Sequence, residues 1–131
     1  MNEIDELKGR IFKQGFAYLN LVNQDKWESW TPAYSFVTAT SLTVVGRYKV
    51  VGRQCFFQVK SSGTSIETTA GASYITLPLT AIGYGGQGQM DNVTTNIIVG
   101  SGVISVANNR FYTPSQGASG NTFTFCGWFE V

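Results

Sequence analysis

The last ten residues, Thr122-Phe-Thr-Phe-Cys-Gly-Trp-Phe-Glu-Val131, carry the clearest structural pattern in this chain. Successive side chains of an extended strand point to opposite faces, so apolar residues at every second position give the strand one buried face. The apolar face consists of Phe123, Phe125, Phe129 and Val131, and the opposite face of Thr122, Thr124, Cys126 and Trp128. The segment therefore predicts a long strand that covers a hydrophobic core.

A second segment, Cys55-Phe-Phe-Gln-Val-Lys60, has the same alternation. Cys55 shares its face with Phe57 and Val59 and should lie in the core, whereas Cys126 lies opposite the apolar face of the last strand. The two cysteines therefore predict separate thiols, with one disulfide across a long loop as the alternative.

Seven further runs rich in β-branched and aromatic residues are separated by turn residues. The runs are 34–37, 41–45, 48–51, 73–79, 95–99, 103–106 and 110–112. The expected breaks are Gly46, Gly52, Gly63, Gly71, Gly100, Gly102 and Asn108-Asn109. Many short strands at this spacing predict a mainly β fold, an antiparallel β-sandwich of jelly-roll type.

The first 28 residues differ in composition, because they hold nine of the 17 ionisable side chains. Ile4, Leu7 and Ile11 recur at helical spacing and predict a short helix over about residues 3–14, with an apolar oligomerisation stripe. The alternative is a helix packed on its own domain. The predicted division is a helical stalk segment over 1–26 and a β-sandwich head domain over 27–131.

The composition excludes several classes of function. A net charge of +1 lacks the cationic excess that nucleic acids and anionic membranes attract, and no apolar run approaches the roughly 18 residues of a membrane span. The chain has no histidine, which removes the commonest general base and metal ligand, and its cysteines lack metal-ligand spacing. We therefore expect no metal or organic cofactor, no nucleic acid and no membrane insertion.

Two Gly-, Asn- and Gln-rich segments, 82–92 and 108–121, are the candidate ligand-binding loops. Gly83-Tyr-Gly-Gly-Gln-Gly88 within the first matches GxGxxG, but no helical pattern follows it, so a flexible surface loop is the better interpretation. Aromatic rings beside amides and hydroxyls suit neutral glycans, whose binding would depend weakly on salt. The candidate ligand-binding residues are Tyr84, Gln87, Gln89, Asp91, Arg110, Tyr112 and Gln116.

Four short motifs stand out: Trp30-Thr-Pro32, Gly46-Arg-Tyr-Lys-Val-Val-Gly-Arg-Gln-Cys-Phe-Phe-Gln-Val59, Tyr74-Ile-Thr-Leu-Pro-Leu79 and Trp128-Phe-Glu-Val131. They resemble motifs of the carboxy-terminal head domains of tailed-bacteriophage tail fibres and receptor-binding proteins. The resemblance covers about residues 27–131. Cys55 and Cys126 depart from it, because Val, Ile or Thr is expected at those positions.

The resemblance implies a homotrimer of β-sandwich heads on a helical stalk, attached to other virion tail proteins and binding a bacterial surface glycan or protein outside the cell. Two alternatives belong to other classes. One is a structural fibre, neck or decoration protein. The other is a small esterase or glycan depolymerase, for which the β-region offers the carboxylates Glu67, Asp91 and Glu130.

The apolar stripe near the amino end predicts the oligomeric state, since Ile4, Leu7 and Ile11 have no evident partner within the chain. We expect light scattering of the purified chain to give about 43 kDa, three times 14.3 kDa. A mass of about 14 kDa would contradict the trimer.

Overall fold

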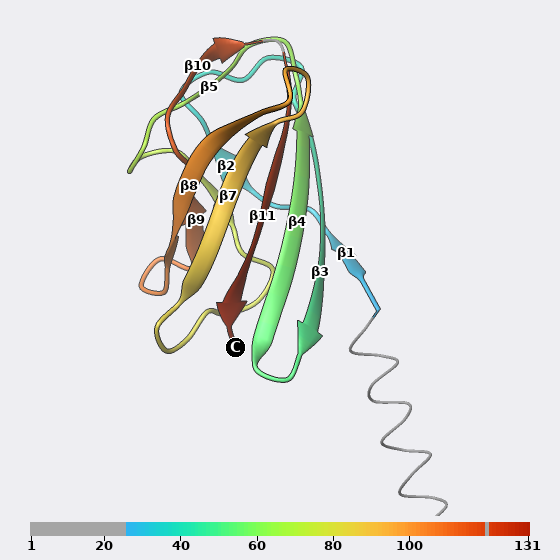
Figure 1. Ribbon diagram of the computed structural model, residues 1–131, viewed down its shortest axis with the longest axis vertical. Helices are drawn as coiled ribbons and strands as arrows, with labels where there is room; N and C mark the ends of the chain where they lie inside the picture. The colour runs from blue at the N-terminus through green and yellow to red at the C-terminus, as the bar shows by residue number, and fades with distance from the viewer. Residues whose placement is uncertain (1–25, 120) are drawn as a thin grey trace, which may run out of the picture.

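The computed structural model describes residues 26–119 and 121–131 of the chain as an antiparallel β-protein (Figure 1). Nine strands form one sheet in the order β1-β3-β4-β11-β7-β8-β9-β6-β2, and β10 pairs with β5 in a second sheet. The long strands are β3 (Thr43–Val51), β4 (Gln54–Ser62), β7 (Gly86–Asn92), β8 (Ile97–Ser105) and β11 (Thr122–Glu130). The short strands are β1 (Glu28–Trp30), β2 (Tyr34–Ser35), β5 (Ile66–Thr68), β6 (Tyr74–Thr76), β9 (Arg110–Tyr112) and β10 (Gln116–Ser119).

The two edge strands of the large sheet, β1 and β2, are consecutive in the chain and only residues 31–33 join them. Strands at the edges of a flat nine-stranded sheet would lie about 38 Å apart, at roughly 4.8 Å a spacing. The connection spans at most about 15 Å. The sheet must therefore curve, and Figure 1 shows β2 and β9 behind the layer of long strands.

The predicted core faces are confirmed. Cys55, Phe57 and Val59 of β4 are buried, as are Phe123, Phe125 and Phe129 of β11, because the register of the two strands places these residues on one face. Phe57 packs against Phe129 and against Phe111 of β9, with ring centroids 6.0 and 5.7 Å apart. The antiparallel β class is thus confirmed, while the jelly-roll sandwich stays a prediction.

Three expected breaks, Gly46, Gly100 and Gly102, are wrong, because each lies inside a continuous strand. At Gly46 and Gly102 an aromatic ring fills the space that the glycine leaves. β3 runs without interruption through Gly46, where the Trp30 ring takes the place of a side chain. β8 likewise joins the predicted runs 95–99 and 103–106, with the Phe111 ring against Gly102. The glycines act here as sites of close approach.

The loop expected over 82–92 is also wrong. Residues 82–85 form a turn, and the rest is β7, hydrogen-bonded to β11 on one side and to β8 on the other. A side chain at Gly88 would meet the Phe111 ring, so the strand needs glycine although the sequence has the composition of a loop.

Other boundaries shift at the sheet's short strands. The predicted runs 34–37 and 73–79 shrink to β2 and β6, while β1, β5 and β10 were not predicted. The segment 108–121 holds the predicted strand β9 and also β10. The predicted helix over 3–14 and the stripe of Ile4, Leu7 and Ile11 lie outside the described residues, so the division at residue 26 stays a prediction.

The packing of Phe111 gives a stability prediction. Gly88→Ala places a methyl group against the ring, and such overpacking costs about 1–3 kcal/mol, so we expect a lower midpoint in chemical denaturation. Gly117→Ala is the matched control: its added carbon meets no atom within 4 Å, and its effect should stay within about 0.5 kcal/mol. Equal stability of both variants would contradict this account of β7.

Candidate functional site

The long strands present a second face, here called the outer face, whose side chains point away from the phenylalanine core. Cross-strand pairs place Phe56 beside Trp128, Trp128 beside Gln87, and Gln87 beside Val103. The next row along the strands joins Gln58, Cys126, Gln89 and Ser101. The register that builds the core therefore also builds a surface of amides, hydroxyls and two aromatic rings.

Four shallow hollows cover the outer face. We number them first to fourth in the order of these volumes: about 590, 310, 460 and 430 Å³. Neighbouring hollows share residues. Gln58 and Cys126 line the first and second, Cys126 and Trp128 the second and third, and Gln87 and Trp128 the third and fourth. They form one continuous groove across β3, β4, β11, β7 and β8.

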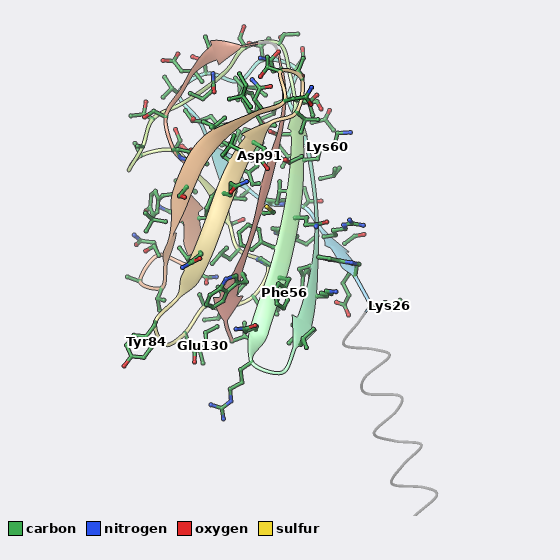
Figure 2. The ribbon with its side chains drawn as sticks, viewed as in Figure 1. Lys26, Phe56, Lys60, Tyr84, Asp91 and Glu130 are labelled. Atoms are coloured by element: carbon green, nitrogen blue, oxygen red, sulfur yellow. The ribbon has the colours of Figure 1, made fainter. Side chains whose placement is uncertain are left out.

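A turn over residues 82–85 closes the fourth hollow and carries Tyr84, whose side chain is fully exposed (105%). The Gly85 N–H donates to the Ile82 carbonyl at 3.2 Å, and Gly83 has φ 65°, a conformation in which glycine is favoured. Glu130 anchors the turn: its backbone pairs with Ile82 and Gly85, and its carboxylate accepts the Tyr84 N–H at 3.2 Å. Figure 2 shows Tyr84 and Glu130 together at this end of the sheet.

The structure brings four of the predicted ligand residues to this surface. Tyr84 and Gln87 line the fourth hollow, and Gln87 and Gln89 line the third. Asp91 lies on the same face of β7 and accepts a hydrogen bond from the Gln89 side-chain amide at 2.7 Å. Their grouping follows from β7 being a strand, because alternate residues of a strand share one face.

The other three predicted residues line none of the four hollows, although Tyr112 pairs with Val103 and so continues the outer face onto β9. Arg110 stacks on the ring of Tyr74, with its Cζ 3.8 Å from the centroid. Tyr112 packs edge-on against the same ring and accepts a hydrogen bond from the Asn108 side chain at 3.1 Å. Gln116 is on β10 in the small sheet, opposite Thr68.

Sequence reasoning missed the residues that complete the groove, above all Phe56, Gln58 and Trp128. All three occupy the outward positions of strands whose inward positions were correctly predicted. The alternation of those strands was the available signal, since each buried phenylalanine fixes the direction of its neighbours.

The two cysteines are free thiols, as predicted. Burial raises the pKa of the Cys55 thiol to about 11. Burial, and to a lesser degree the negative charge of Asp91, raises the pKa of the Cys126 thiol. Neither environment favours the thiolate that nucleophilic or redox chemistry requires.

Asp91 and Glu130, two of the three carboxylates considered for hydrolysis, are too far apart within one chain to form a hydrolytic pair. Asp91 pairs with Thr124, and Glu130 lies six residues further along β11, a separation of about 20 Å. Glycoside hydrolysis needs two carboxyl groups roughly 5–10 Å apart.

Among the described residues no group of three or more carboxylates and thiols is arranged to bind a metal ion. The same part of the chain has no helix of the length and apolar character that crossing a membrane requires.

Comparison of the chain with protein-family models, with curated proteins and with solved structures finds no match. The function must therefore be inferred from the groove and its residues.

The raised pKa values predict slow thiol chemistry. At pH 8 we expect a disulfide reagent to modify Cys126 more slowly than free cysteine, and Cys55 only after unfolding, because the thiolate is the reactive form. The Cys126 rate should rise about tenfold per pH unit below its pKa.

Asp91→Asn should accelerate modification of Cys126 modestly and leave Cys55 unchanged, since burial is the larger cause of the Cys126 shift. Mass spectrometry of the modified protein identifies the site. Modification of Cys126 at the rate of free cysteine would contradict the burial argument.

Proposed function

We propose that this chain is the receptor-binding head of a tailed-phage tail fibre, which binds a bacterial surface glycan as a homotrimer. The observation that carries the proposal is the fully exposed Tyr84 on an anchored turn beside a hollow. The anchored turn holds this ring in solvent beside the hollow, where its apolar faces and its hydroxyl are available to a ligand.

The chemistry of the hollow fits a sugar. The rings of Tyr84 and Trp128 offer apolar surfaces to the faces of a pyranose. Gln54 and Gln87 offer amide donors and acceptors, and Glu130 accepts hydrogen bonds, which matches the hydroxyl groups around such a ring. Stacking of a base on an aromatic side chain is worth about 1–3 kcal/mol, and we expect the same order here.

The test is an array of bacterial surface polysaccharides probed with the labelled full chain. We expect binding to a restricted set of glycans, and Tyr84→Ala should weaken it about 5- to 150-fold by removing the stacking surface. Tyr84→Phe keeps the ring and should retain most of the affinity. The melting temperature should stay unchanged in both variants.

Val93→Ala is the control, because Val93 is an exposed apolar residue at the other end of β7. Binding by Tyr84→Ala as strong as the parent's would place the site elsewhere. No binding to any glycan by the folded chain would instead favour the structural virion protein, and release of reducing sugars would favour the depolymerase.

A further inference from the structure

The first hollow is lined by two cations and no carboxylate, whereas the fourth is lined by one of each, Arg53 and Glu130. Arg47, Lys49 and Lys60 project from the outer face of β3 and β4, and we call them the basic half of the groove. Arg47 and Lys60 are diagonal neighbours across the two strands and both line the first hollow, which contains no carboxylate. Arg47 and Lys60 therefore border the first hollow and Lys49 borders the second, whereas the third hollow, around Gln87, Gln89 and Ser101, is uncharged.

Two of these cations share one aromatic partner. The Cζ of Arg47 lies 4.7 Å and the Nζ of Lys49 lies 5.0 Å from the centroid of the Trp27 ring. The ring attracts each of them, but it brings like charges close together without neutralising either. A bound anion would relieve that repulsion.

Among the described residues, the nearby carboxylates do not provide a negative partner for these cations. The Arg47 Nε donates to the Gln58 side-chain oxygen at 2.7 Å, which is a neutral partner. Asp91 faces the groove two strands away from Lys60 and accepts a hydrogen bond from Gln89. The Glu28 carboxylate accepts a hydrogen bond from the Tyr48 hydroxyl at 2.8 Å. None of the three cations forms an ion pair in that part of the chain.

The basic half is continuous with the Tyr84 hollow, but it lies on β3 and β4, across β11 from β7, and its cations are spread from the row of Trp128 to the row of Thr124. Lys60 pairs with Thr124, and Glu130 is six residues further along β11, about 20 Å away. Figure 2 shows Lys60 and Tyr84 at opposite ends of the long strands. A ligand that reaches both must be an extended oligomer.

We propose that the groove takes an anionic polysaccharide segment, with a carboxylate or phosphate group at the basic half and a sugar ring at Tyr84. This inference rests on the proposed function, since it specifies the glycan, and it replaces the neutral glycan that the loop sequences alone suggest with an anionic one. Arg47 provides a planar pair of donors that suits either group, and Lys49 and Lys60 add charge.

The experiment compares acidic glycans from the array with their neutral forms. Uronic acid polysaccharides are tested beside carboxyl-reduced samples of the same polymers, and phosphate-substituted ones beside dephosphorylated samples. We expect the parent chain to bind the acidic form at least tenfold more tightly at low salt. The preference should shrink as salt screens the charges, and the class of bound glycan distinguishes carboxylate from phosphate.

The double variant Arg47→Gln/Lys60→Gln should lose this preference and keep its affinity for the neutral form. Lys26→Gln is the matched control, because Lys26 is also an exposed lysine close to Trp27 in the chain, but it lines none of the four hollows. Tyr84→Ala should weaken the acidic and the neutral form equally.

Two results would overturn this inference: the parent chain binds acidic and neutral forms equally, or the double variant keeps the acidic preference. Either result would leave the proposed glycan-binding function standing. No binding to any glycan would overturn the proposed function itself. The melting temperatures of all variants, which are changed only at exposed positions, verify that each one is folded.

Discussion

Nine consecutive residue pairs join β4 to β11, from Gln54 opposite Glu130 to Ser62 opposite Thr122. Because side chains alternate along both strands, this one register sends Phe57 and Phe125 inward and Phe56 and Trp128 outward. A slip of one residue would exchange the two sets, and each phenylalanine moved to water would lose about 1.5–3 kcal/mol of burial energy. The free energy that fixes the core thus also fixes the groove, although the groove residues contribute little to it.

The groove also depends on aromatic rings that pack closely against glycines of the long strands. Gly127, Gly88 and Gly102 are neighbours on three adjacent strands, and their inward sides are covered by the rings of Phe57 and Phe111. Side chains at these positions would push the rings away, so the strands would lose their support from beneath. The outward neighbours of the glycines depend on that packing for their positions.

Local alternation made part of this structure predictable. The faces of β4 and β11 and the separate thiols follow from the alternation of apolar and polar residues in these two strands. The turn at Gly52 follows from the glycine, which takes a positive φ there. The strand β7 could not be predicted, because its glycines have the composition of a loop and the ring of Phe111 that explains them is distant in sequence. The candidate site was predicted through Tyr84 and Gln87, whereas the residues contributed by β3 and β4 required knowledge of the strand order.

The shallowness of the groove bears on the oligomeric state. A single exposed ring with a few amide hydrogen bonds supplies only a few kcal/mol, and binding must also offset the loss of translational and rotational freedom. One copy of such a surface would therefore hold a cell weakly. A polysaccharide repeats its units, however, so several copies on one assembly can bind the same cell surface, and linked sites raise avidity by about 10²–10⁴ without a new contact. The proposed trimer and the proposed polymeric ligand are therefore consistent with each other, because a repeating ligand lets several shallow sites on one assembly bind together.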